Sequence, residues 1–198
     1  MAPVTGVVLA GGGSTRMGQE KTSLSFSGQS LLERVLDVLG QATQDIVMVT
    51  SRPMDVPGAR LVLDLVPGRG PLAGIHAGLK ASTGWAAFVV ACDMPFLSPG
   101  LIRHMISLGH GYQVVVPFVK GQYEPMHALY SRECLGPIES ALEDPHPRIV
   151  QFFPEVLVRK VSHGEIARFG RPERIFFNAN TPEDLERAFQ MEAGDNHD

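Results

Sequence analysis

The sequence contains very little cysteine. Cys92 and Cys134 are the only two cysteines among 198 residues. Neither lies in a C-x-x-C pair or in the mixed Cys/His spacing of zinc sites. The sequence therefore indicates neither a disulfide framework nor a structural zinc site.

An excess of positive charge is also missing. The chain has 17 Lys and Arg residues against 21 Asp and Glu residues, which gives a formal net charge of -4. Nucleic acids and anionic membrane surfaces bind clustered positive charge, so we expect neither as a partner. An anionic ligand would need a local group of arginine, lysine and backbone N–H groups.

Long hydrophobic runs are absent as well. No apolar stretch approaches the ~20 residues that span a bilayer. The first residues read as a short strand and not as a basic segment followed by an apolar one, so we expect a cytoplasmic protein. With 44% hydrophobic residues the chain can bury one substantial core. We predict a single domain over residues 1–193 and a polar, frayed tail over residues 194–198.

Strand-like and helix-like segments alternate through the first half of the chain. Apolar runs predict strands over residues 6–9, 46–49, 61–63 and 86–91. Helix-start residues and helical spacing predict helices after Ser30, over residues 71–81 and after Ser98. Such alternation through short loops predicts an α/β protein, with a three-layer α/β/α Rossmann-like fold and a mostly parallel central sheet.

The second half is less regular. Its apolar runs predict strands over residues 113–117, 126–130 and 156–161. A short helix is expected over residues 137–142, and a last helix after Thr181 as its N-cap.

Polar groups follow three of the predicted parallel strands. They are the glycines after the first strand, Asp64 after the third and Asp93 after the fourth. Ligands of open α/β sheets bind beyond the carboxyl ends of the strands, so we expect these groups to share one site. Each aspartate also has an alternative role as an ordinary turn or cap residue.

The first of these loops has the composition of an anion site. Gly11, Gly12 and Gly13 let backbone N–H groups approach a ligand closely, and Arg16 and Lys21 follow as cations. Position 16 is not the glycine or alanine of a dinucleotide fingerprint, and the lysine does not directly follow a glycine as in a Walker A loop. The loop therefore indicates phosphate binding of another type.

Four segments together resemble a known family. The nucleotidyltransferases related to the molybdenum cofactor guanylyltransferase are similar at residues 9–12, 16–18 and 21, at residues 70–74, at residues 92–95 and at residues 178–185. These segments occur in order over almost the whole chain. Gly11 favours guanine over cytosine, because cytidylyltransferase relatives usually have alanine there. The chain departs from the family at Glu20, which is usually Asp, and at Thr50, which is often a nucleotide-contacting Asn.

The resemblance implies transfer of GMP from GTP to the terminal phosphate of molybdopterin (the molybdenum cofactor). Residues 1–110 would bind GTP, and residues 111–193 would bind the acceptor. Arg16, Lys21 and Asp93 would be catalytic, with Asp93 as the ligand of Mg²⁺. Nucleotide binding would fall to Leu9, Ala10, Gly11, Gly12, Gly13, Lys21, Asp64 and Asp93.

On the acceptor side, the resemblance points to Asn178 and Asn180, and Arg148 is expected to bind the acceptor phosphate. Residues 123–127 are predicted to form a further acceptor-binding loop, in which His127 is expected to be structural. Transient contact with other proteins of the cofactor pathway is expected from the resemblance alone.

Two other functions stay open at this point. The chain could be a cytidylyltransferase, or another nucleotidyltransferase of the same fold with a different phosphorylated acceptor. It could instead be a non-catalytic module that delivers the cofactor. The joint presence of Arg16, Lys21 and Asp93 favours an enzyme, because such transfer depends on positioned cations.

Overall fold

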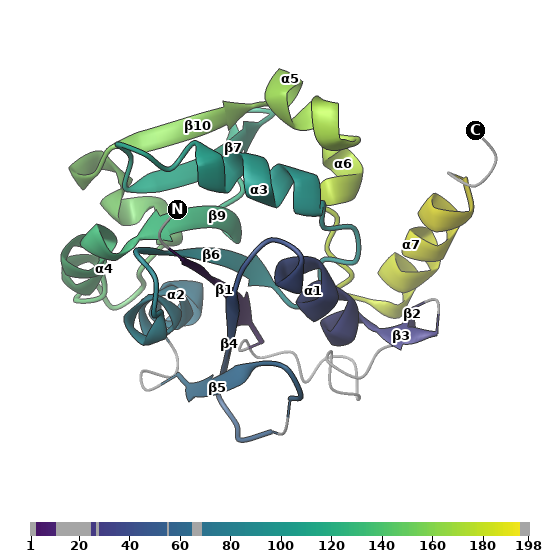
Figure 1. Cartoon of the computed structure of the whole chain (residues 1–198), viewed down its shortest axis with the longest axis horizontal. Helices are drawn as coiled ribbons and strands as arrows, with labels where there is room; N and C mark the ends of the chain where they lie inside the picture. The colour runs from purple at the N-terminus through teal and green to yellow at the C-terminus, as the bar shows by residue number, and fades with distance from the viewer. Residues whose placement is uncertain (1–2, 11–24, 27, 55, 65–68, 195–198) are drawn as a thin grey trace.

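The fold is built on one mixed sheet, seen in a computed structural model that describes residues 3–10, 25–26, 28–54, 56–64 and 69–194. Its eight strands follow the order β10-β7-β9-β6-β1-β4-β5, and β8 pairs with β7 (Figure 1). The strands are β1 Val4–Leu9, β4 Asp45–Thr50, β5 Arg60–Leu63, β6 Ala86–Ala91, β7 Val114–Val119, β8 Gln122–Tyr123, β9 His127–Ser131 and β10 Val158–Ser162.

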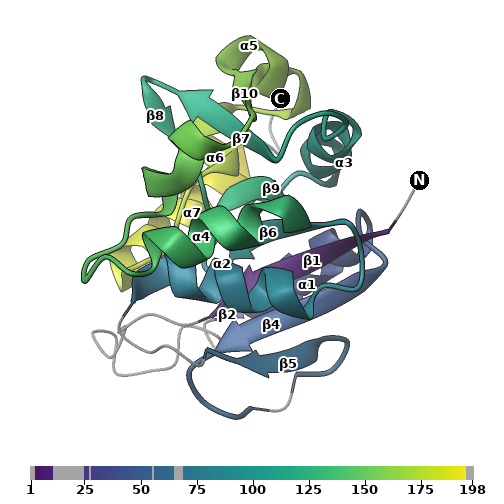
Figure 2. The ribbon, with the colours of Figure 1, turned by 90° about the vertical axis from the view of Figure 1, so that its left-hand side faces the viewer.

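Helices cover both faces of this sheet (Figure 2). The α-helices are α1 Leu31–Gly40, α2 Gly70–Ala81, α3 Pro99–Ser107, α4 Leu135–Ala141, α5 His163–Ile166, α6 Pro172–Ile175 and α7 Pro182–Gly194. Short 3₁₀ helices are η3 Arg132–Cys134, η4 Ile149–Glu155 and η5 Ala167–Phe169. A separate two-stranded sheet pairs β2 Ser25–Phe26 with β3 Gln29–Ser30.

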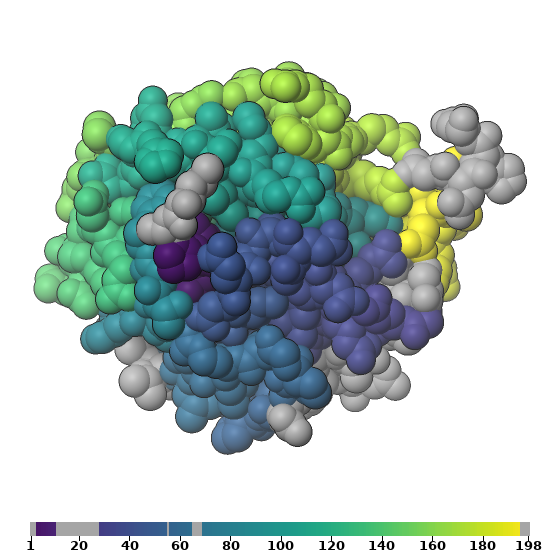
Figure 3. Space-filling view, viewed as in Figure 1, coloured from purple at the N-terminus to yellow at the C-terminus, as the bar shows by residue number. Residues whose placement is uncertain are grey.

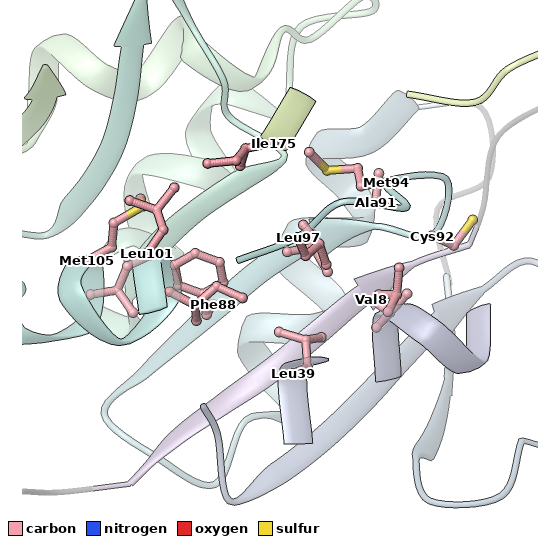
Figure 4. Close-up of a cluster of buried hydrophobic side chains, with 14 of the residues drawn as sticks. Val8, Leu39, Phe88, Ala91, Cys92, Met94, Leu97, Leu101, Met105 and Ile175 are labelled. Carbon is pink, nitrogen blue, oxygen red and sulfur yellow. The ribbon is translucent and has the colours of Figure 1, made fainter. Parts of the chain in front are cut away.

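The core lies on both faces of the central strands, because alternate side chains point to opposite sides. On β6, Phe88 and Val90 pack with the α1 and α3 layer (Figure 4), whereas Ala87 and Val89 pack with the α2 and α4 layer. All six residues of β6 are buried, as expected of a strand covered on two sides. Helix α2 approaches β1 closely at Gly78, where a Cβ atom would lie 2.4 Å from Val7.

Two helix starts confirm the local signals in the sequence. The Ser30 hydroxyl accepts from the Glu33 backbone N–H at 3.2 Å, and the Ser30 backbone N–H donates to the Glu33 carboxylate at 2.8 Å. These two bonds form a capping box. In the same way Ser98 caps α3 by accepting from the Leu101 N–H at 3.3 Å. The mostly parallel α/β fold is confirmed.

The second half contains more antiparallel pairing and more short elements than its sequence signals. Strand β9 runs antiparallel to β6 and to β7, and β8 returns along β7 through a turn in which Lys120 and Gly121 have positive φ angles. None of β2, β3, β8, α5 or α6 was predicted. Elements of two to four residues leave too little periodicity to detect.

The C-terminal helix α7 lies beside α1 at the periphery of the molecule (Figure 3). Its start at Thr181 is confirmed, because the Thr181 hydroxyl accepts from the Asp184 N–H at 3.1 Å. The helix extends through Gly194, and residues 195–198 of the predicted tail lie outside the described residues. Among the helices that the structure describes, none has the length and apolar character needed to cross a membrane.

Candidate active site at the carboxyl edge of the sheet

The residues that follow β1, β4, β5 and β6 lie at one edge of the sheet. The parallel hydrogen bonds continue one residue past the strands, because Ala10 N–H donates to Val49 at 2.9 Å and Cys92 N–H donates to Leu9 at 3.2 Å. Asp64 N–H likewise donates to the Thr50 carbonyl at 2.9 Å. Leu9 and Ala10 thus stand at the centre of this edge, between Asp64 and the residues after β6.

The predicted phosphate loop starts at this central point. Gly11, Gly12, Gly13, Arg16 and Lys21 follow Ala10 directly in the sequence and lie outside the described residues. Their assignment to phosphate binding stays a prediction.

Asp93 lies just beyond β6 and is 9% exposed. The buried side chains of Cys92 and Met94 flank it in the sequence. Its backbone carbonyl accepts a hydrogen bond of 2.8 Å from the N–H of Ala179. This bond joins the end of β6 to the segment that precedes α7, far away in the sequence.

The same bond brings the two predicted asparagines to Asp93, because they flank Ala179. Ala179 is fully buried against Leu31 and Phe96. The Asn178 amide donates to the Phe176 carbonyl at 3.1 Å. Asn180 is exposed, and its backbone N–H donates to the Asp184 carboxylate at 3.1 Å. The structure therefore gathers Asp93, Asn178 and Asn180 at one edge of the sheet.

A turn before β9 reaches the same edge. His127 at the start of β9 lies opposite Val90 of β6 in antiparallel register, so the residues before it run beyond the carboxyl end of β6. The His127 ring packs edge-on against Phe88 and Phe176, with ring centroids 5.2 Å apart in both cases. Phe176 in turn leads to Asn178. The loop over residues 123–127 thus borders the segment that carries the asparagines.

Burial dominates the ionisation of the groups in this turn. His127 is fully buried, and its ring nitrogens have no hydrogen-bond partner among the residues the structure describes. Burial lowers its pKa to about 3, so the ring is neutral near pH 7. This environment agrees with the structural role expected for it. Burial also raises the pKa of Glu124.

Asp64 and Thr50 lie on the other side of β1. Asp64 is half-buried and follows β5. Thr50 is 4% exposed, and its hydroxyl accepts from the Arg52 N–H at 3.3 Å. The hydroxyl is therefore engaged in a local turn, which weakens Thr50 as a substitute for the asparagine that is usual in the family.

Arg148 belongs to the opposite helix layer from the asparagines. It is exposed and precedes η4, where its N–H donates to the Gln151 side chain at 3.2 Å. The neighbouring Asp144 carbonyl accepts from Arg69 at the start of α2, at 2.5 Å. Arg148 thus lies in the α2 and α4 layer, whereas Ala179, between the two asparagines, packs against Leu31 of α1.

Arg34 is a structural link to the site that no motif singled out. Its guanidinium donates to the Pro95 carbonyl at 2.8 Å and pairs with Glu192 of α7 at 2.8 Å. It therefore ties the loop after β6 to both α1 and α7. These contacts span 61 and 158 positions, so only helical amphipathicity, which places Arg34 on the polar side of α1, could have hinted at them.

A surface hollow of about 440 Å³ lies at the opposite edge of the sheet. Trp85, Gln113 and Ser131 line it, and they stand where β6 and β7 begin and where β9 ends. Ligands of such sheets bind at the carboxyl edge. We therefore place the candidate site at Asp93 and not in this hollow.

The similarity to known proteins extends over almost the whole chain and is not limited to these motifs. Residues 6–156 match the family described as MobA-like NTP transferase domain. A probable molybdenum cofactor guanylyltransferase of Pelotomaculum thermopropionicum is 40% identical over 194 residues, covering 96% of this chain and 94% of that protein. The molybdenum cofactor guanylyltransferase of Desulfosudis oleivorans is 38% identical over 192 residues, covering 95% of each.

Solved structures share the fold. The molybdopterin-guanine dinucleotide biosynthesis protein A of Archaeoglobus fulgidus aligns with a TM-score of 0.80 at 29% identity, over 96% of this chain and 100% of that one. Rv0371c of Mycobacterium tuberculosis aligns with a TM-score of 0.76 at 21% identity, over 95% and 98% of the two chains, and supports the fold alone. The strand-end site, the matched residues and the extent of these similarities together place the chain in the family of MobA-like nucleotidyltransferases.

Proposed function

We propose that this protein transfers GMP from GTP to the terminal phosphate of molybdopterin or the molybdenum cofactor, with release of pyrophosphate. The observation that carries the proposal is the hydrogen bond from Ala179 N–H to the Asp93 carbonyl. It joins the strand-end site of the first half to the Asn178 and Asn180 segment of the second. A nucleotide bound by the first half would meet an acceptor bound by the second. The names of the two bacterial relatives above support this pair of substrates.

In this proposal the first half binds GTP. Gly11, Gly12, Gly13, Arg16 and Lys21 would surround the triphosphate, next to Leu9 and Ala10 at the centre of the edge. Asp64 would accept hydrogen bonds from guanine, because a carboxylate matches its adjacent N1–H and amino donors. Arg148, Asn178 and Asn180 would bind the acceptor.

Asp93 suits the role of a Mg²⁺ ligand. Mg²⁺ commonly takes one or two protein carboxylates and fills its other positions with water and phosphate oxygens. Asp93 supplies one buried carboxylate at the carboxyl edge, and among the described residues no group of three or more His, Cys, Asp or Glu forms a protein-only metal site. A bound Mg²⁺ would neutralise charge on the phosphates.

The reaction requires little of the protein beyond positioning and cations. An anionic phosphate oxygen of the acceptor attacks the α-phosphorus of GTP, and the bond to the departing pyrophosphate breaks. The attacking group carries no proton that must be removed, so no general base is needed. Arg16 and Lys21 would stabilise the charge that develops on the phosphates.

Pyrophosphate release tests this proposal. The purified protein is incubated with Mg²⁺, molybdopterin and each of the four nucleoside triphosphates in turn. We expect release with GTP only, and only in the presence of the pterin. Release with CTP alone would overturn the guanine assignment, and no release with any nucleotide would overturn the transferase function.

A further inference from the structure

The turn that carries Glu124 is held rigidly in place. The Glu124 N–H donates to the Pro117 carbonyl at 3.1 Å, and the Glu124 carbonyl accepts from the His127 N–H at 3.0 Å. The Tyr130 hydroxyl donates to the Pro125 carbonyl at 2.6 Å. Because β7 and β9 anchor these bonds, the Glu124 backbone has a defined position before any ligand arrives, which favours binding.

This turn lies at the same carboxyl edge as Asp93. His127 lies opposite Val90, one residue before the end of β6, and the Glu124 N–H donates to Pro117 near the end of β7. The turn is therefore level with the end of β6, from which Asp93 follows. Phe176, whose ring packs on His127, brings the Asn178 segment to the same place.

The Glu124 carboxylate is half-buried without a protein partner. Within the part of the chain that the structure describes, no side chain or backbone group hydrogen-bonds or ion-pairs with it. Because the half-buried carboxylate loses part of its hydration, its pKa is raised. An ordinary turn glutamate would extend into solvent and avoid this cost. A half-buried carboxylate with a raised pKa in a site is typical of a group that binds a ligand.

A carboxylate only accepts hydrogen bonds, and its two oxygens match two adjacent donors. The 2-amino-4-oxopyrimidine edge has such donors, as a ring N–H beside an amino group. Both possible substrates carry this edge, in the guanine of GTP and in the pterin of the acceptor. The edge alone therefore does not decide which ring Glu124 would meet.

The sheet order separates the two rings. From β9 to β5 the strands run β9-β6-β1-β4-β5, and four strand intervals of ~4.8 Å amount to roughly 19 Å. Glu124 precedes β9, Asp64 follows β5, and Ala10 directly after β1 lies between them. A dinucleotide product has two rings at its ends and a pyrophosphate in the middle, so it matches this order.

We propose that Glu124 recognises the 2-amino-4-oxo edge of the pterin and thereby sets specificity for the acceptor. This inference rests on the proposed function, since it assumes a pterin acceptor. Asp64 would read the guanine, and Glu124 would read the pterin at the opposite end of the site.

The first test needs only the unmodified protein. Pterin (2-amino-4-oxopteridine) and lumazine (2,4-dioxopteridine) differ where the amino donor is replaced by an oxo acceptor. Their dissociation constants are measured by the change in their own fluorescence. We expect pterin to bind about ten- to a hundredfold more tightly, the value of a hydrogen bond to a charged group. Equal binding of the two would overturn the role of Glu124 even if GMP transfer to molybdopterin is observed.

The second test uses Glu124→Gln, with Glu155→Gln at an exposed position as the control. The change should weaken pterin binding about ten- to a hundredfold. It should not weaken lumazine binding, because a glutamine amide can donate to the 2-oxo group and accept from the neighbouring ring N–H. The KM for molybdopterin should rise with it, while the KM for GTP changes less than about twofold. A rise in the KM for GTP alone, or in the Mg²⁺ concentration needed for half-maximal rate, would contradict the proposal.

Different results would contradict the proposed function and the assignment of Glu124. If the unmodified protein binds neither pteridine and transfers no GMP to molybdopterin, the proposed function is wrong. If it transfers GMP but does not distinguish the pteridines, only the assignment of Glu124 is wrong. The pteridine comparison also holds if the Glu124→Gln variant does not fold.

Discussion

Residues 1–110 and residues 111–193 contribute to the same sheet edge by different structural routes. In the first half, parallel strands alternate with the long helices α1, α2 and α3. Its candidate residues stand at regular strand ends, such as Asp64 and Asp93. In the second half, β7 pairs antiparallel with β8 and β9 and parallel with β10, and several short helices precede the longer helix α7. Its candidate residues, Glu124 and Asn178 among them, come from turns and connecting segments.

The difference shows how one fold can combine a phosphate site, which depends on the sheet topology, with an acceptor site, which depends on particular long-range contacts. Parallel strands direct their carboxyl ends to one edge by topology alone, so a phosphate site there needs little else. The acceptor side depends on a few long-range bonds, above all the one from Ala179 to Asp93. Changes in the first half should therefore affect catalysis, whereas changes in the second should affect acceptor binding.

The largest expected effect tests the first half. Lys21→Ala should lower kcat by ~10²–10³, as expected when one charge-stabilising group is lost. Lys80→Ala, at an exposed position in the last turn of α2, is the control. Steady-state rates with GTP and molybdopterin measure the effect. Near-normal turnover of Lys21→Ala would show that the loop does not act on the reacting phosphates.

Asp93 serves both halves with different groups. Its carboxylate is the proposed Mg²⁺ ligand, and its backbone carbonyl accepts the hydrogen bond from Ala179. Asp93→Asn keeps the backbone carbonyl that accepts from Ala179, so the link between the halves should remain. We expect kcat to fall by about 10² and the Mg²⁺ requirement to rise, with an unchanged melting temperature. A Mg²⁺ titration and thermal unfolding measure both. A large drop in melting temperature with an unaltered Mg²⁺ requirement would assign Asp93 a structural role instead.

The pH dependence of stability tests the burial of His127, which lies where the two halves of the chain meet. Its pKa is about 3 in the folded protein because of burial, against ~6.5 when unfolded. Below pH 6.5 the unfolded state therefore binds a proton that the folded state does not, so the free energy of unfolding decreases as the pH is lowered. Between pH 7 and pH 5 the free energy of unfolding of the unmodified protein should decrease by about 2 kcal/mol more than that of the His127→Leu variant.

Denaturant unfolding at both pH values measures this difference. His146→Gln, at an exposed position, should keep the pH dependence of the unmodified protein. Parallel curves for His127→Leu and the unmodified protein would mean that His127 is protonated without unfolding.

The smallest expected effect concerns the acceptor side. Asn178→Ala should raise the KM for molybdopterin about tenfold, the value of one hydrogen bond, and leave the KM for GTP unchanged. Gln122→Ala at an exposed position is the control. An equal rise in both KM values would remove the functional division between the two halves.

Local signals were sufficient for much of the fold and for part of the site. Sequence patterns predicted the caps at Ser30 and Ser98, the strand Ala86–Ala91 and the parallel arrangement. Each of these depends on neighbouring residues or on a short sequence period. The contacts of Arg34, the position of Glu124 within the predicted loop over residues 123–127 and the antiparallel direction of β9 could not be predicted in this way. Their positions depend on residues far away in the sequence, which no local pattern records.

By itself the sequence determined the α/β alternation, the family and the strand ends where polar groups would gather. Only the tertiary structure decided that Ala179 meets Asp93, that Arg148 and the asparagines come from opposite helix layers, and that Glu124 lies beside the end of β6. The physical reason is that helix caps and strand alternation are short-range effects, whereas register and layer packing minimise the free energy of the whole chain. Two segments meet only when the elements between them have packed.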